Sequence, residues 1–254
     1  MTSSPALSLE RVLAVDVGAT NIKYCLVDAE GELLESPRRR PTPYPCTPER
    51  LVEVIADRIV RAEVTRAGVG FPGEFAEGRV VGSGNLARPG GVSTPVDPEL
   101  DARWRGFGLQ GALVAATGVD VRVVNDATLA ALGACTGVGR EVVITLGTGF
   151  GLALIVNGER VRVRDVGAAP FDPQRTYDQA LGERARAEDE ARWHDDAVAA
   201  ISGFVSEFDA DRVHLAGGNA RRVSPEMFSH FTVPVSIEGN LAPLRGAARL
   251  FYPI

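Results

Sequence analysis

The sequence is poor in lysine and in cysteine. Lys23 is the only lysine among 27 basic residues, and the three cysteines are Cys25, Cys46 and Cys135. The cysteines are widely spaced and form no Cys-x-x-Cys pair, so we expect neither a disulfide framework nor a structural zinc site. The preference for arginine runs through the whole chain, so it adds little weight to Lys23 as a functional residue.

Long apolar runs and excess positive charge are missing too. No apolar run approaches the roughly 18 residues that span a membrane, and Met1–Leu9 lacks the basic start and apolar core of a signal peptide. The net charge of −6 disfavours nucleic-acid binding, which needs a basic surface, and no helix-turn-helix segment precedes the first predicted strand. We therefore expect a cytoplasmic protein that binds neither membrane nor nucleic acid.

The composition is that of an ordinary globular protein, and 254 residues can bury a sizeable core. Strand and helix periodicity predicts an order of three strands, a helix and a fourth strand near the N-terminus: 11–17, 22–28, 33 onward, a helix from 48 and a strand at 67–71. The same order recurs from about residue 119. We therefore expect two α/β domains, 1–116 and 117–254, with a ligand cleft between them. The final helix is expected to pack back on the N-terminal domain.

Three polar, glycine-rich loops each follow a predicted strand. They are Asp16–Asn21, Gly147–Gly151 and Ala216–Asn219. Such turns let backbone N–H groups approach phosphate oxygens, and a carboxylate at a strand end can hold Mg²⁺. Each loop alone is more typical of a plain turn. Neither the GxGxxG nor the GxxxxGK[ST] pattern is present, so the sequence does not support a Rossmann or P-loop site.

A fourth feature is Asn125-Asp126-Ala127, at the end of a predicted buried strand where a helix begins. A carboxylate in this position can accept the proton of a substrate hydroxyl. Asn and Asp are also favoured as helix N-caps, and for this feature taken alone the capping role is favoured.

Taken in order, these features resemble those of the ROK sugar kinases, and within them the short polyphosphate/ATP glucokinases. The resemblance runs from about Val12 to Leu250. The matching motifs are Asp16-x-Gly18-x-Thr20, Gly70-x-Pro72-Gly73, Asn85, Trp104-Arg105-Gly106, Asn125-Asp126-Ala127, Leu146-Gly147-Thr148-Gly149-x-Gly151, Ala216-Gly217-Gly218, Asn240 and Gly246-Ala247-Ala248. Each motif is short, but the ordered set is specific.

The resemblance implies a two-domain actin-like ATPase (ribonuclease H-like) fold and transfer of a phosphoryl group from ATP or polyphosphate, with Mg²⁺, to a hexose-like hydroxyl. Asp126 would be the catalytic base. Sugar hydroxyls would be bound by Asn85, Asn125, Asp126 and Asp165. The donor phosphates or nucleoside would be bound by Asp16, Gly18, Thr20, Asn21, Lys23, Gly147, Thr148, Gly149, Gly217 and Gly218, with Asp16 holding Mg²⁺, directly or through water. A homodimer is also expected from the resemblance.

The sequence departs from the family pattern near the sugar site. The family's Glu-x-Gly-His element corresponds to Asp165-Val166-Gly167-Ala168, which shortens one carboxylate and removes the imidazole. Losing a hydrogen-bond partner for a hydroxyl should change selectivity. This leaves a second hypothesis, a non-catalytic sensor that binds a sugar or nucleotide.

From the sequence alone, two further segments can each be interpreted in two ways. Residues 87–103 are an insertion, predicted as a long surface loop that could also cover the sugar pocket. Arg160, Arg162 and Arg164 alternate, which places them on one face of a predicted strand. They could receive a polyanionic donor, although a solvated strand edge is favoured.

Overall fold

The computed structural model describes residues 10–164, 166–223 and 231–252. These residues form two compact units, one made of 10–123 together with 247–252 and the other of 124–246. The first unit extends past the predicted boundary at residue 116 because strand β7 joins its sheet. Among the described helices, none combines the length and apolar character that crossing a membrane requires.

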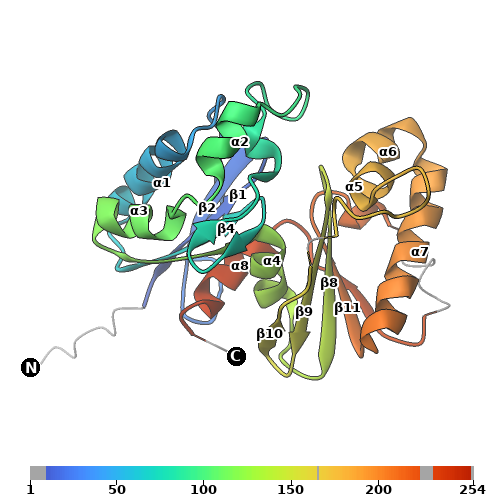
Figure 1. Cartoon of the computed structure of the whole chain (residues 1–254). Helices are drawn as coiled ribbons and strands as arrows, with labels where there is room; N and C mark the ends of the chain where they lie inside the picture. The colour runs from blue at the N-terminus through green and yellow to red at the C-terminus, as the bar shows by residue number, and fades with distance from the viewer. Residues whose placement is uncertain (1–9, 165, 224–230, 253–254) are drawn as a thin grey trace, which may run out of the picture. The chain divides into compact units, whose positions relative to one another are not determined.

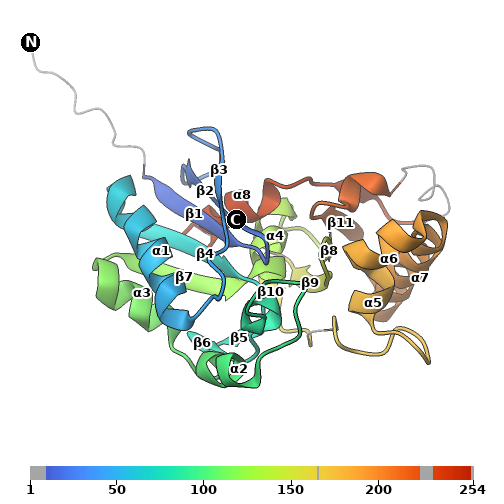
Figure 2. The ribbon, with the colours of Figure 1, turned by 90° about the horizontal axis from the view of Figure 1, so that it is seen from above.

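The first unit contains a five-stranded sheet in the order β3-β2-β1-β4-β7. Its strands are β1 Val12–Val17, β2 Asn21–Val27, β3 Arg38–Pro41, β4 Arg66–Phe71 and β7 Asp120–Asn125, with a separate hairpin of β5 Phe75–Ala76 and β6 Arg79–Val80. Its helices are α1 Pro48–Ala62, α2 Pro98–Trp104 and α3 Leu109–Thr117, with the 3₁₀ turn η1 Gly84–Ala87. Helices α1 and α3 lie side by side (Figure 2).

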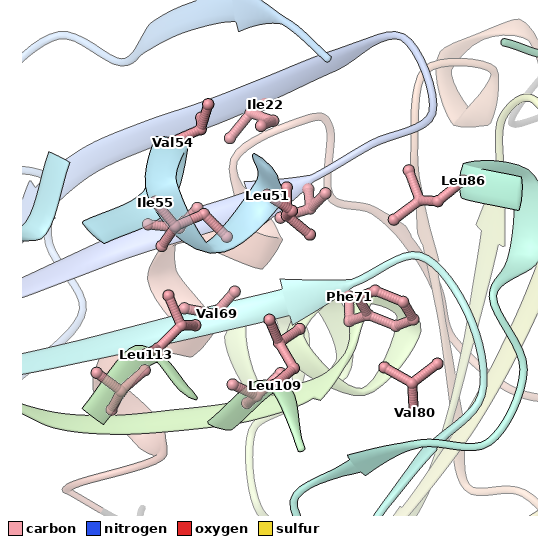
Figure 3. Close-up of a cluster of buried hydrophobic side chains, with 14 of the residues drawn as sticks. Ile22, Leu51, Val54, Ile55, Val69, Phe71, Val80, Leu86, Leu109 and Leu113 are labelled. Atoms are coloured by element: carbon pink, nitrogen blue, oxygen red, sulfur yellow. The ribbon is translucent and has the colours of Figure 1, made fainter. Parts of the chain in front are cut away.

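Local sequence explains where α1 begins and what it buries. The Thr47 side chain accepts a hydrogen bond from the Arg50 N–H, and Pro48 occupies the first turn, where a missing N–H costs nothing. Apolar side chains at helical spacing then face the sheet. Figure 3 shows this core, with Leu51 and Ile55 of α1 near side chains from β2, β4 and α3. Burial of this stripe fixes α1 on the sheet.

Two predictions about the first unit are wrong. Residues 87–103 are not irregular throughout, because Asp97 caps helix α2 and Pro98 lies at its first position, where proline is tolerated. Trp104 at the end of α2 is fully buried and donates its indole N–H to the Cys46 carbonyl. The third strand is β3 rather than a strand from residue 33, which makes only an isolated bridge with Val27.

The second unit repeats this connectivity, with the sheet order β10-β9-β8-β11-β12. Its strands are β8 Arg140–Leu146, β9 Phe150–Val156, β10 Glu159–Val161, β11 Arg212–Ala216 and β12 Val235–Ile237. Its helices are α4 Asp126–Ala134, α5 Tyr177–Leu181, α6 Glu183–Glu188 and α7 Glu190–Phe208, with the turn η2 Ala220–Arg222. The repeated order begins at β8, not near residue 119, since β7 belongs to the first sheet. Helix α8, Ala242–Arg249, has residues in both units.

Alternation along β8 places helices on both faces of the second sheet. Val142 and Ile144 pack in one cluster with residues of α7, whereas Val143 packs with Ala131 of α4. Figure 1 shows α4 and α7 against opposite faces. The predicted arginine stripe is not confirmed, because β10 ends at Val161 and leaves Arg162 and Arg164 outside the strand.

Candidate functional site

Asp16 lies at the end of β1, where the sheet brings it beside a lysine. It is opposite Lys23 of β2 and Gly70 of β4, and it is only 8% exposed. The Lys23 ammonium nitrogen is 3.2 Å from Asp16 Oδ2. A nearly buried carboxylate at a strand end is a suitable oxygen ligand for Mg²⁺, which typically takes one or two protein carboxylates plus waters and phosphates. Asp16 therefore fits the metal role that the sequence predicts.

Hydrogen bonds from Thr42 and Tyr44 hold the backbone carbonyls of the turn that follows Asp16. The carbonyl oxygens of Gly18 and Ala19 accept hydrogen bonds from Thr42 Oγ1, at 2.7 Å, and Tyr44 Oη, at 2.6 Å, and Thr20 O accepts one from the Thr42 N–H. Three successive carbonyls are thus engaged, and the Gly18 N–H donates to Asn21 O at 3.0 Å within the turn, so the other N–H groups of the turn are the polar groups that can face an anion. No motif in the sequence singles out Thr42 and Tyr44, since only the β2–β3 pairing brings them to the turn.

Asn85 lies in the turn η1 of the first unit, and its side chain is held by the inserted segment. Arg88 donates from Nε to Asn85 Oδ1 at 3.1 Å and from a terminal nitrogen to the Thr94 carbonyl. The Thr94 hydroxyl in turn bonds the backbone at Gly90 and Gly91. The insertion therefore begins with a closed loop centred on Arg88.

The second and third glycine loops pack directly on each other in the second unit. The Asn219 backbone N–H donates to Leu146 O at 2.9 Å, and its side-chain amide donates to Gly147 O. Gly217 has a φ of +92°, and a Cβ there would collide with the Leu146 carbonyl oxygen. Glycine is needed at this position for both reasons. The third loop is therefore a support for the second.

Helix α5 also contacts the second hairpin, which is formed by β8 and β9 with the second glycine loop as its turn. The Asp178 carboxylate accepts a hydrogen bond from the Phe150 N–H at 2.8 Å, and it lies against Gly149 and Gly167. No motif in the sequence singles out Asp178. Its position in the first turn of a capped helix, after Thr176, is a common place for an acidic residue, so the sequence offered no distinguishing signal.

Asp126 opens helix α4, as predicted, and Asn125 is its N-cap. Asn125 Oδ1 accepts hydrogen bonds from the N–H groups of Ala127, at 2.9 Å, and Thr128. Asp126 is half-buried. The neighbouring Ala127 packs close to Gly151, where a Cβ would lie 3.1 Å from the Ala127 Cβ. The start of α4 and the second hairpin are therefore adjacent.

The predicted site residues are thus distributed over the two units. The first unit holds Asp16, Gly18, Thr20, Asn21, Lys23 and Asn85, and the second holds Asn125, Asp126, Gly147, Thr148, Gly149, Gly217 and Gly218. Asp165 lies outside the described residues. Ala168, where the family has histidine, is exposed.

The second unit also contains a buried polar cluster, whose residues Glu141 and His214 lie on the paired strands β8 and β11. Ligand-type atoms of Cys135, Glu141 and His214 are within 4.8 Å of one another. His214 Nε2 is 2.8 Å from Glu141 Oε2, and Nδ1 is 2.8 Å from Ser236 Oγ. Glu141 also accepts hydrogen bonds from the Thr136 and Gly137 N–H groups. These contacts engage both imidazole nitrogens and both carboxylate oxygens, which is typical of a structural network.

Residues 12–168 match the sequence profile of the ROK family. The chain belongs to the ROK family. This agrees with the ordered set of loops now located in the two units. The similar connectivity of the two sheets is that of the actin-like two-domain ATPase fold of ROK sugar kinases.

Relatives with similar sequences include a glucokinase and a polyphosphate glucokinase. The chain is 31% identical to the glucokinase of Streptomyces coelicolor over 166 residues, which cover 62% of this chain and 47% of that protein. It is 25% identical to the polyphosphate glucokinase of Mycobacterium tuberculosis over 249 residues, which cover 92% of this chain and 88% of that protein. The match therefore spans about half of the Streptomyces protein and most of the mycobacterial one.

Among solved structures, the chain is similar to the inorganic polyphosphate/ATP-glucomannokinase from Arthrobacter sp. strain KM. The identity is 28%, the TM-score is 0.76, and the match covers 94% of this chain and 96% of that one. The likeness extends over both units, so the fold of this ROK protein is that of a complete solved kinase chain.

Proposed function

We propose that this ROK protein is a glucokinase-like sugar kinase that transfers a phosphoryl group from ATP or polyphosphate to a hydroxyl of a hexose or hexose-like sugar. The observation that carries the proposal is that the start of helix α4, which begins at Asp126, packs through Ala127 against the second glycine hairpin, and that the third loop packs on the same hairpin. Relatives that phosphorylate sugars align over nearly the whole chain.

Each part of the proposed site has a distinct task. Asp126 accepts the proton of the attacked hydroxyl, and Asn85, Asn125 and Asp165 bind the sugar. Gly18, Thr20 and Asn21 and, in the second loop, Gly147, Thr148 and Gly149 contact the donor phosphates. The N–H groups of Gly18 and Gly147 close their own turns by donating to Asn21 O and Gly149 O, so these two glycines allow close approach and the other N–H groups of the two turns can bind phosphate oxygens. Lys23 adds positive charge, and Gly217 and Gly218 face the nucleoside or the distal end of the donor. Asp16 would hold Mg²⁺, which when bound neutralises phosphate charge. A homodimer and a cytoplasmic location stay predictions.

Replacing Asp126 by asparagine tests the assigned base. Asp126→Asn keeps the size of the side chain but removes the proton acceptor, so turnover should fall by about 10²–10⁴-fold. The measurement is sugar-phosphate formation with Mg²⁺, ATP or polyphosphate, and a panel of hexoses. Asp195→Asn, which changes an exposed aspartate of α7, should leave the rate unchanged. If the Asp126→Asn enzyme kept the wild-type rate, Asp126 would not be the catalytic base.

The absence of a polar side chain at Ala168 favours a second candidate, a sensor that binds sugar or nucleotide without reaction. A pocket that lacks one partner for a hydroxyl can still bind a sugar through its remaining polar groups. Calorimetry that detects tight binding of a sugar, with no phosphorylated product for any donor, would support the sensor over the kinase.

A further inference from the structure

We propose that Arg88, from the segment 87–103, is a positioning residue. It orients the Asn85 side-chain amide so that the amide nitrogen, and not the oxygen, meets the sugar. This inference rests on the proposed function, in which Asn85 contacts the acceptor. Arg88 takes no part in the chemical step. It acts through Asn85, three residues earlier in the chain.

The chemistry of the contact fixes the orientation of the amide. A guanidinium group only donates hydrogen bonds, so the Asn85 atom 3.1 Å from Arg88 Nε is the amide oxygen. The amide nitrogen therefore points away from Arg88. Asn85 then presents a donor to a ligand, and this donor binds a lone pair on a hydroxyl, carbonyl or carboxylate oxygen. It does not accept from a protonated amine, and the neighbouring guanidinium repels one.

Arg88 is itself held in place by the rest of its loop. A terminal nitrogen donates to the Thr94 carbonyl, and the Gly91 N–H donates to the Arg88 carbonyl at 2.9 Å. Gly91 has a φ of +81°, and a Cβ there would lie 3.2 Å from the Tyr44 ring. The Tyr44 hydroxyl bonds the Ala19 carbonyl in the first phosphate turn. The insertion therefore contacts both Asn85 and, through Tyr44, the turn that follows Asp16.

Steady-state kinetics on Arg88 variants test the proposal. Arg88→Ala frees the Asn85 amide to rotate, so the KM for the sugar should rise about tenfold while kcat and the KM for the donor stay within about twofold. Arg88→Lys keeps a donor but loses the fork that reaches both Asn85 and Thr94, so it should recover part of the affinity. Arg103→Ala removes another arginine of the same segment, one that pairs with Glu49 at the surface, and should change none of the constants.

A double-mutant cycle with Asn85→Ala separates positioning from direct contact. If Arg88 acts through Asn85, removing Arg88 from the Asn85→Ala protein should not change the KM for the sugar further. A full additional loss would show that Arg88 contacts the sugar itself and would overturn the positioning role. A circular-dichroism melt of each variant identifies any effect that comes from unfolding.

The acceptor panel supplies a second readout. Neutral hexoses should be preferred over glucosamine, whose amine is protonated at neutral pH, and Arg88→Ala should reduce this preference. Wild-type kinetics equal to those of Arg88→Ala would remove the role of Arg88 and leave the kinase intact. A wild-type protein that neither binds nor phosphorylates any sugar would instead remove the proposed function, and this inference with it.

Discussion

A single side chain, Tyr44, links the turn after Asp16 to the segment 87–103. Its hydroxyl donates to the Ala19 carbonyl at 2.6 Å, and its ring lies against Gly91. Burial, only partly offset by the nearby Arg88 charge, raises the pKa of Tyr44 to about 12, so the hydroxyl stays protonated and able to donate at physiological pH. The conformation of the turn therefore depends on a residue more than twenty positions away in the sequence.

Tyr44→Phe should weaken donor binding while keeping the ring contact. Losing one hydrogen bond costs about 1 kcal/mol, which corresponds to roughly a fivefold rise in the KM for the donor. The measurement is the initial rate as a function of donor concentration at saturating sugar. Tyr24→Phe is the control, since Tyr24 packs beside Arg58 rather than on the turn. An unchanged donor KM for Tyr44→Phe would show that the turn holds its shape without this bond.

At the scale of elements, the second hairpin depends on two supports that approach it from different directions. The third loop contacts Leu146 and Gly147, and the first turn of α5 contacts Phe150 through Asp178. Gly182, between α5 and α6, lies close to the Thr148 carbonyl as well. These contacts fix the conformation of the hairpin, which suits the phosphate-binding role proposed for it.

Alanine substitutions at Gly217 and Gly218 test the contact between the third loop and the hairpin. Gly217→Ala forces a side chain into positive φ and against the Leu146 carbonyl, so the free energy of unfolding should fall by about 3 kcal/mol. Gly218→Ala meets no atom within 4 Å, and its effect should stay within about 0.5 kcal/mol. Denaturant unfolding measures both. Equal effects would contradict the proposed tight contact between the third loop and the hairpin.

The elements that could be predicted from the sequence are those with a local signal. Thr47 and Pro48 mark the start of α1, and mainly apolar runs mark the buried strands β1 and β8. Helix α2 has no clear signal in the sequence, because the three prolines of segment 87–103 favour a loop, although Pro98 lies at the first helical position, where a helix accepts proline. The short strand β12 and the hairpin β5–β6 were missed too, since strands of two or three residues have too few positions to show a period.

The candidate site was predictable to a similar extent. Residues within the glycine loops and at the start of α4 follow strands and could be found from their position along the chain. Thr42, Tyr44 and Asp178 act through contacts over 24 or more residues. Such contacts depend on strand pairing and helix packing, which no short motif encodes. The sequence shows how long the segment 87–103 is, but it does not indicate that the Arg88 side chain contacts Asn85.

At the scale of the whole molecule, the network around Glu141 and His214 makes stability depend on pH. Glu141 on β8 is fully buried, and His214 on β11 lies between it and Ser236 and Glu238 near β12. Burial alone would raise the pKa of Glu141, but hydrogen bonds from the Thr136 and Gly137 N–H groups and from His214 outweigh it and lower the pKa below 4.5. The ionised carboxylate therefore stabilises the folded protein.

Glu141→Gln should reduce this pH dependence. Because the folded pKa is lowered, the stabilisation is fully present above about pH 4.5 and is lost as the pH falls through the folded pKa. Wild type should exceed the variant by about 3 kcal/mol at pH 7. The difference should narrow below pH 4.5, by at most about 1.4 kcal/mol per pH unit. Denaturant titrations from pH 3 to 7 measure it, with Glu53→Gln, an exposed change on α1, as the control. A constant difference would contradict the assignment.

The presence of a single lysine makes selective chemical labelling of its side chain possible. Because Lys23 is the sole lysine and is paired with Asp16, the only side-chain amine in the protein stands next to the carboxylate assigned to Mg²⁺. The Lys23 side chain is 35% exposed, so an acylating reagent can reach it. Mass spectrometry of the peptide that contains Lys23 then follows this one side chain separately from the α-amine, and shielding of the side-chain amine by a bound donor can be read without any enzymatic assay.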